Sequence, residues 1–257
     1  MSRKRKNPPE SYRDRKYRKI PETSGLQSCQ VKVRETDLHI LAPIDVAAEA
    51  THLIVQYRIQ LENYLARSPA FSDSLTPLDD DPTGVPLVRE MLRAGLAAGV
   101  GPMAAVAGVI AEYVGRDLLK INACDEVVVE NGGDIFMQRR KDCIAAIFAG
   151  ESPLSYRVGV RVPAESMPLG ICTSSGTVGH SLSLGQADSV TVISPSTALA
   201  DAAATKLGNE VGRGGDIGPA LDVAATIPGL TGVVIVVGEE LGAWGQVELV
   251  EIDNQDS

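Results

Sequence analysis

An aspartate and a threonine four residues apart, Asp201 and Thr205, are the pair best placed to do chemistry. In a helix this spacing puts both side-chain oxygens on one face, one turn apart. A carboxylate and a hydroxyl suit a hard cation such as Mg²⁺, with a phosphate and water filling its other positions. The pair alone leaves open that Asp201 is a surface residue and that Thr205 bonds back to its own helix.

A hydroxyl-rich strand end provides a second set of candidates. The run Thr173–Thr177 leads from an apolar strand pattern into a glycine, and it contains Ser174, Ser175 and Gly176. Hydroxyls and free backbone N–H groups at such a point can hold phosphate oxygens or a cofactor ring. An ordinary polar turn is the alternative interpretation.

A glycine pair between two apolar runs provides the third set, Asn131, Gly132, Gly133 and Asp134. A hairpin turn with residues at positive φ is the plain prediction. The functional prediction is a backbone that approaches a ligand closely, with Glu130, Asn131 or Asp134 bonded to a base or a ribose.

Two weaker signals complete the candidates. Gly99–Ala104 fits G-x-G-x-x-A, but a helical pattern precedes it where a dinucleotide fingerprint needs a strand, so a Rossmann site is rejected. Gly101 and Pro102 still open a helix, whose free N–H groups favour an anion. His180 follows the hydroxyl run by three residues and is the candidate catalytic histidine.

Hydrophobic periodicity predicts an α+β fold of mixed or antiparallel sheets packed with helices. Helices are expected at 46–67, 86–97, about 102–119, 195–207 and 217–226. The helix 195–207 would have Ser194 as its N-cap, Pro195 as its first residue and Gly208 as its C-terminal cap. Strands or hairpins are expected at 30–41, 126–130, 135–139, 143–148, 156–162, 170–174, 189–193, 232–237 and 245–250. Residues 1–28 form a tail and linker, and residues 29–257 form one domain.

Composition narrows the class of protein. The four cysteines include no C-x-x-C pair, and no apolar run reaches the ~18 residues that would span a bilayer. The basic N-terminus lacks an apolar signal region, so we expect a reduced, cytoplasmic protein with no membrane partner. The Ala- and Gly-rich helices suit close packing between subunits, so a homodimer is a further expectation.

Charge is divided between the tail and the body of the chain. Residues 1–20 carry nine Lys or Arg and two acids, a net charge of +7. Because the whole chain has a net charge of −9, the other 237 residues carry −16. An acidic body repels phosphate backbones, which argues against nucleic-acid binding except through the tail. A solvated tail is the plainer interpretation of those basic residues.

Taken together, these segments resemble the ApbE-like flavin transferase family over about residues 95–208. Asp188–Gly208 resembles that family's strand and the helix after it, which bears Ala-Asp-x-x-x-Thr. Ser174-Ser175-Gly176 resembles the family's Ser-Gly segment, and Asn131-Gly132-Gly133-Asp134 resembles its Gly-Gly-Asp turn. Gly101 to Gly108 matches its glycine-rich helix entry. The resemblance implies an ApbE-like, T-fold-like architecture, FAD and Mg²⁺ as cofactors, and transfer of FMN to a threonine.

By the same resemblance, Asp201 and Thr205 would hold the metal, and residues 131–134 and 174–176 would line the flavin nucleotide pocket. Mg²⁺ would then neutralise the pyrophosphate. The family's His-x-x-Asp-Pro-x-x-Gly loop has no Asp-Pro counterpart here between Thr177 and Ala187. The two expectations are therefore a flavin- or nucleotide-binding transferase or hydrolase, and a non-catalytic structural or partner-binding descendant.

Overall fold

The computed structural model describes residues 25–175, 185–212 and 214–252. The strands of the large sheet are β1 (Gln27–Val33), β2 (Thr36–Ala42), β3 (Val127–Asn131), β4 (Asp134–Gln138), β7 (Leu169–Ser174), β8 (Ser189–Ser194), β9 (Gly232–Val237) and β10 (Glu240–Gly245). Those of the small sheet are β5 (Cys143–Ala146), β6 (Val158–Val162) and β11 (Glu248–Glu251). The helices are α1 (Ala47–Arg67), α2 (Pro69–Asp73), α3 (Pro86–Ala98), α4 (Val106–Leu118), α5 (Thr197–Glu210) and α6 (Gly218–Ala224), with short 3-10 turns η3 (Pro102–Ala105) and η4 (Ala164–Ser166).

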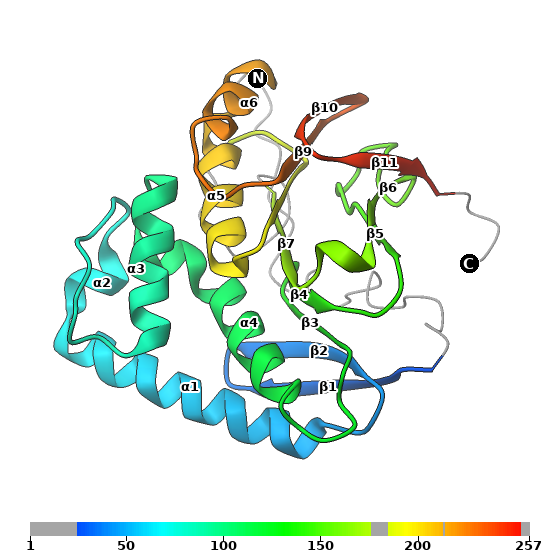
Figure 1. The fold of residues 1–257 in the computed structure, drawn as a ribbon. Coiled ribbons are helices and arrows are strands. Elements are labelled where there is room, and N and C mark those ends of the chain that lie inside the picture. Colours follow the sequence, from blue (N-terminus) through cyan, green and yellow to red (C-terminus); the bar gives the residue numbers. More distant parts are fainter. Residues whose placement is uncertain (1–24, 176–184, 213, 253–257) are drawn as a thin grey trace.

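Both sheets are antiparallel throughout, which confirms the predicted α+β class. The large sheet has the order β1-β2-β3-β4-β7-β8-β9-β10, and the small sheet has the order β11-β6-β5. The helices lie on one side of the large sheet and the small sheet lies on the other (Figure 1). The sheet therefore needs apolar side chains on both of its faces.

The strand sequences supply these two apolar faces by alternation. Val127, Val129 and Phe136 belong to the core beneath the helices, whereas Val128 and Met137 belong to the core beneath the small sheet. Successive side chains of a strand point to opposite faces, so a continuous valine run serves both cores. This parity also fixes which polar residues at the strand ends face the helices.

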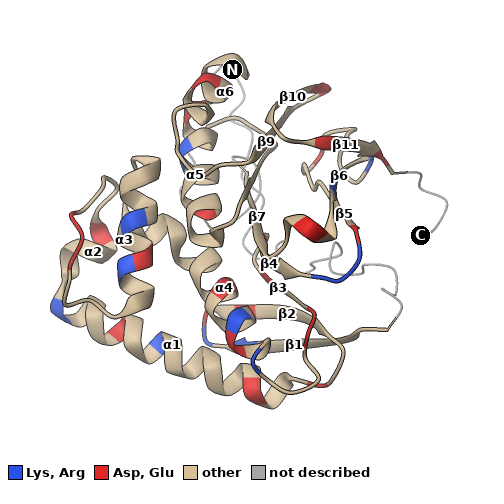
Figure 2. Cartoon of the chain, in the orientation of Figure 1, with Lys and Arg blue, Asp and Glu red and all other residues tan. Residues whose placement is uncertain are grey.

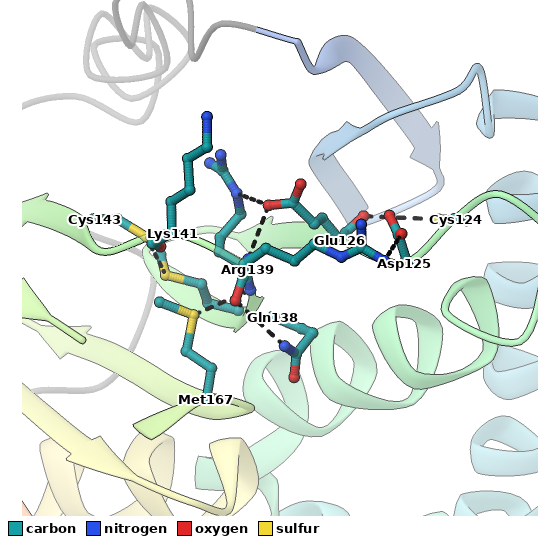
Figure 3. A network of polar contacts seen from close by, with 10 residues as sticks. Cys124, Asp125, Glu126, Gln138, Arg139, Lys141, Cys143 and Met167 are labelled. Atoms are coloured by element: carbon teal, nitrogen blue, oxygen red, sulfur yellow. Dashed lines mark hydrogen bonds and ion pairs between the residues drawn. The ribbon is translucent and has the colours of Figure 1, made fainter. Parts of the chain in front are cut away.

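The β3–β4 hairpin confirms the predicted Gly-Gly turn. Asn131 pairs with Asp134, and Gly132 and Gly133 occupy the turn at φ 71° and 110°. Glycine reaches positive φ without steric cost, which explains the pair. The opposite end of the hairpin is closed by Glu126, which accepts hydrogen bonds from Nε of the buried Arg139 and from the backbone of Arg140, each at 2.9 Å (Figure 3).

The ends of α5 differ from the prediction. The helix begins at Thr197, its N-cap is Ser196, and it continues to Glu210. Ser194 instead ends β8, where its Oγ donates to the Gly229 carbonyl at 2.9 Å, so it is committed to the sheet. Gly208 lies inside the helix. A methyl group on Gly185 would come within 1.6 Å of the Gly208 carbonyl oxygen, so this close backbone approach needs glycine at position 185.

The predicted C-terminal strand 245–250 is two strands in different sheets. β10 ends at Gly245, which has a φ of 83°, and β11 begins at Glu248. The left-handed glycine turns the chain out of the large sheet and into the small one. The segment predicted at 30–41 is a hairpin whose first strand begins at Gln27, inside the stretch predicted to be tail and linker. The helix predicted at about 102–119 begins as the 3-10 turn η3, and the remaining predicted elements agree within two residues at each end.

The acidic triplet Asp79–Asp81 is held by neighbouring side chains. Asp80 accepts from the Arg89 guanidinium at 3.2 Å and lies 3.8 Å from the Arg93 guanidinium. Both arginines belong to helix α3, which carries basic (blue) and acidic (red) residues in Figure 2. Asp81 accepts from the Thr83 backbone and from the Tyr64 hydroxyl, each at 2.9 Å. These contacts give the triplet a local structural role.

Across the described part of the chain, no single helix has the length and apolarity needed to cross a membrane. In this part of the chain, α3 and the segment η3–α4 have the length and composition of a membrane span only when they are taken together, and they are bent by 107° at their junction.

We predict that Gly115→Ala destabilises the fold. The new methyl group would lie 2.2 Å from Cδ1 of the buried Phe136 ring, so the ring or α4 must move. Overpacking of this kind costs about 1–3 kcal/mol and should outweigh the roughly 1 kcal/mol that alanine gains over glycine in a helix. Urea unfolding measures the change.

Gly212→Ala is the matched control, because nothing lies within 4 Å of its new methyl group. Equal midpoints for both variants would contradict the packing described here.

Candidate functional site

Helix α5 lies against strand β7 at very short range. A methyl group on Gly170 would come within 2.4 Å of Thr197 Cα, and the Cys172 thiol lies 3.4 Å from the Thr197 carbonyl oxygen. Asp201 and Thr205 follow Thr197 at steps of four, so they form one stripe on the helix. Thr197 and Asp201 of this stripe face the row of β7 that points to the helices, which is Gly170, Cys172 and Ser174. Thr205, the next residue of the stripe, is partly buried.

Asp201 closes the N-terminus of helix α4. Its Oδ2 accepts from the backbone N–H of Gly108 at 2.8 Å, and the N–H of Ala107 also bonds to the carboxylate. These amides belong to the first turn of α4, whose N-cap Ala105 makes no side-chain hydrogen bond. The first N–H groups of a helix have no partner within it, so Asp201 acts as a cap from another element.

Glu112 does the same for helix α5. Its Oε2 accepts from the N–H of Thr197, the first residue of α5, at 2.7 Å, and its Oε1 pairs with Arg116 at 2.6 Å. Glu112 is only 4% exposed. Each helix thus supplies a carboxylate to the other's N-terminus, and each carboxylate is stabilised by the positive end of the helix dipole.

A second carboxylate lies beside Asp201. Asp134, 8% exposed, begins β4 opposite Cys172 and points to the helix side of the sheet. Its carboxylate lies beside the Cys172 thiol and accepts from the Thr173 backbone. Within the described residues, no ion pair includes Asp134 or Asp201.

Burial and like charge act on both acids. Burial raises the pKa of Asp134 well above its usual range, and the neighbouring charges of Asp201 and Glu130 raise it further. Burial also raises the pKa of Asp201, to about 7, against the lowering effect of the two α4 amides. Two carboxylates that approach each other without a basic partner need a proton or a cation between them.

Ser174 adds an unpartnered hydroxyl to this side of the sheet. The residue is 7% exposed, and its buried Oγ has no hydrogen-bond partner among the described residues. It lies two residues beyond Cys172 on the same face of β7, toward the Gly-Gly turn. Thr197 Oγ1 is also unpartnered, but a methyl group on Gly170 would be 2.8 Å from it, so the packed backbone leaves that hydroxyl no room for a ligand.

The other residues of the Gly-Gly turn are partly engaged with protein groups. Asn131 Nδ2 donates to the Ala107 carbonyl at 3.1 Å, and the Gly133 N–H donates to Glu130 Oε1 at 2.8 Å. Gly132 is exposed, with nothing near the position of an added methyl group. The turn is therefore fixed against α4 and still presents one open backbone unit.

Some predicted site residues lie elsewhere or outside the described residues. The Gly101 N–H donates to the Leu75 carbonyl at 3.1 Å, and Gly101 and Pro102 are buried in η3 and its cap. The helix entry that was expected to present free N–H groups to an anion is therefore packed against the chain. Ser175 follows Ser174 and is half-buried. Gly176 and His180 lie outside the described residues, so their predicted roles stay predictions.

A pocket with a volume of about 380 Å³ opens away from this cluster. Its lining includes Arg161, Leu169, Ile193 and Glu248. Leu169 is at the opposite end of β7 from Ser174, and both Leu169 and Ile193 belong to the core under the small sheet. The pocket contains none of the predicted site residues.

Sequence reasoning missed Cys172 and Glu112. Cys172 precedes Ser174 by two residues, and strand alternation therefore places it on the same face, beside the partner strand's Asp134. Glu112 is an isolated acid in the apolar run 105–115, which is a signal for a buried and partnered carboxylate.

Solved structures show the class of fold. The Vibrio cholerae flavin transferase ApbE matches with a TM-score of 0.53 and 15% identity, over 85% of this chain and 97% of that one. The ApbE protein of Thermotoga maritima matches with a TM-score of 0.53 and 12% identity, over 84% and 96%. At these identities the comparison shows an ApbE-like fold.

The family follows from the sequence comparisons. The family model described as "AbpE bacteria" matches residues 18–240, and the chain belongs to that family. A UPF0280 protein of Methanococcus maripaludis is 42% identical over 236 residues, which is 88% of this chain and 95% of that protein. A UPF0280 protein of Methanocaldococcus jannaschii is 40% identical over 236 residues, with 88% and 94% covered.

We predict that the acid pair makes stability depend on pH. An unfolded aspartate ionises near pH ~3.9, and the folded pKa values are raised, so between about pH 4 and 7 the folded chain binds more protons than the unfolded chain. The free energy of unfolding contributed by the pair therefore falls as pH rises through the folded pKa. Melting temperatures of the wild type and Asp134→Asn, measured from pH 5 to 8 with EDTA, should shift steadily in the variant's favour.

Asp216→Asn is the control, because Asp216 is exposed just before α6, where its Oδ1 accepts from the Gly218 N–H at 3.0 Å. Its melting temperatures should follow the wild type across the range. A constant difference between Asp134→Asn and the wild type would show that Asp134 has no raised pKa.

Proposed function

We propose that this chain binds FAD or a related nucleotide through a Mg²⁺ ion held at Asp201 and Thr205, and that it cleaves the nucleotide's pyrophosphate by transfer or hydrolysis. The observation that carries the proposal is that the buried Asp134 and the partly buried Asp201 lie close together with no basic partner within the described residues. The solved flavin transferases that share the fold support the choice of nucleotide.

The donor set fits a hard divalent cation. The candidate ligands are carboxylate and hydroxyl oxygens, namely Asp201, Thr205 and the unpartnered Ser174 Oγ. Mg²⁺ in proteins is usually held by one or two carboxylates together with substrate phosphates and water. The two acids of this cluster, Asp201 and Asp134, fall within that number. Among the described residues no group of three or more His, Cys, Asp or Glu could hold a metal alone, so the nucleotide phosphates complete the site.

When bound, Mg²⁺ would offset charge on the pyrophosphate and on the leaving phosphate oxygen. The chain's residues have separate roles. The α5 stripe presents Asp201 and Thr205, and the Gly132 backbone lets a ligand approach the end of the hairpin. The hydroxyl-rich end of β7 offers donors for phosphate or ring atoms. His180 remains the candidate acid or base.

A second function is favoured by one contact. Because Asp201 Oδ2 already caps α4, the aspartate has a structural role that needs no ligand. A non-catalytic, partner-binding descendant of the fold would keep Asp201 for this reason alone. In that case Asp201→Ala lowers stability by about 0.5–2 kcal/mol, the usual effect of losing a cap, and alters no ligand binding.

We predict magnesium-dependent nucleotide binding that requires the α5 stripe. FAD, FMN and ADP are titrated into the full chain by calorimetry, with Mg²⁺ or with EDTA. FAD should bind the wild type tightly only with Mg²⁺, and Asp201→Asn and Thr205→Ala should each weaken it about tenfold or more, since each removes a cation ligand. Thr205→Ala leaves the α4 cap intact, so its loss of binding is separable from a loss of folding.

Asp216→Asn should bind FAD as the wild type does. Failure of all three nucleotides to bind the wild type with Mg²⁺ would remove the proposal. Binding that needs neither Mg²⁺ nor Asp201 would move the nucleotide to another site and favour the structural role of the α5 stripe.

A further inference from the structure

We propose that Asp134 is a second carboxylate ligand of the divalent cation, so that strand β4 and helix α5 hold the metal together. This inference rests on the proposed function and adds a residue to its metal site.

The first support is the placement of both acids around one point of helix α4. Asn131 pairs with Asp134 across the hairpin, and its side-chain amide donates to the Ala107 carbonyl. Asp201 accepts from the N–H groups of Ala107 and Gly108. The start of α4 is therefore touched from the sheet by the turn that carries Asp134 and from α5 by Asp201. A methyl group on Gly108 would lie 2.8 Å from Asp201 Cβ, so the two helices hold this geometry tightly.

The second support is the direction of the Asp134 side chain. Its register partner Cys172 points to the helices, where its thiol reaches the Thr197 carbonyl. Residues directly opposite in an antiparallel pair share a face, so Asp134 also points to α5. Both Asp134 and Cys172 lie within electrostatic reach of Asp201.

The third support is the balance of charge. The N-terminus of α4, equivalent to about +0.5 charge, already acts on Asp201. A cation bound to Asp201 alone would also face that positive end, whereas a second carboxylate offsets it. Asp134 is the buried acid placed to do so, and it has no ion pair within the described part of the chain.

The fourth support is the unpartnered hydroxyl of Ser174. Its Oγ is buried and has no hydrogen bond to any residue that the structure describes, and it lies on the same face of β7 as the Cys172 that pairs with Asp134. A buried hydroxyl without a partner costs free energy unless a ligand or water satisfies it. Ser174 and the two carboxylates together offer only hard oxygen atoms, which selects Mg²⁺ or Mn²⁺ over softer metals.

The test uses Mn²⁺ as a paramagnetic probe of the full chain. Free Mn²⁺ is measured by electron paramagnetic resonance, with and without ADP, and Mg²⁺ is then added to displace it. The chains compared are the wild type, Asp134→Asn, Asp201→Asn and the control Asp216→Asn. We expect Asp134→Asn and Asp201→Asn each to weaken Mn²⁺ binding about tenfold or more, and the control to bind as the wild type does.

The outcomes separate this inference from the proposed function. If Asp201→Asn weakens Mn²⁺ binding but Asp134→Asn binds like the wild type, Asp134 is no ligand and the proposed function stands. If the wild type binds no Mn²⁺ with or without ADP, the proposed function fails and this inference fails with it. If Asp134→Asn does not melt cooperatively, the smaller Asp134→Ser takes its place with the same expected loss.

Discussion

The exchange of carboxylates between helices α4 and α5 is the contact on which the rest of the structure depends. Asp201 of α5 satisfies the first-turn amides of α4, and Glu112 of α4 satisfies the first amide of α5. Unpaired helix amides in a packed interior are costly, so each helix needs the other in one register. Gly108 permits this register, because a methyl group there would be 2.5 Å from the Thr197 carbonyl oxygen.

That register determines what lies beneath the helices. With Thr197 fixed between Gly108 and Gly170, Asp201 follows one turn later and is brought to the row of β7 and β4 that holds Cys172 and Asp134. A shift of α5 by one residue would rotate Asp201 by about 100° away from the sheet. The acid pair is therefore a consequence of helix packing, and its like charges are tolerated because the surrounding contacts hold both residues in place.

The sequence was informative wherever local chemistry decides the structure. The Gly-Gly pair predicted the β3–β4 turn, the 232–237 apolar run predicted β9, and the spacing of four placed Asp201 and Thr205 on one helix face. Contacts distant in sequence were not predictable in this way. Gly101 fitted an anion-binding helix entry, yet its amide bonds to Leu75 in a loop whose position depends on α2 and α3. The role of Glu112 needed α5 as its partner, which no local pattern specifies.

The two oxygens of Asp201 reconcile a structural with a chemical role. The α4 amides bond to the carboxylate, with Gly108 at Oδ2, and no basic side chain among the described residues pairs with it, so it can still meet a cation. Capping fixes the carboxylate's orientation, and metal sites depend on just such outer contacts to orient their ligands. A ligand held this way loses little freedom on binding a cation, so the bond to α4 supports coordination at Asp201. The same contact would remain useful in a relative that had lost the cation, because the first amides of α4 would still need an acceptor.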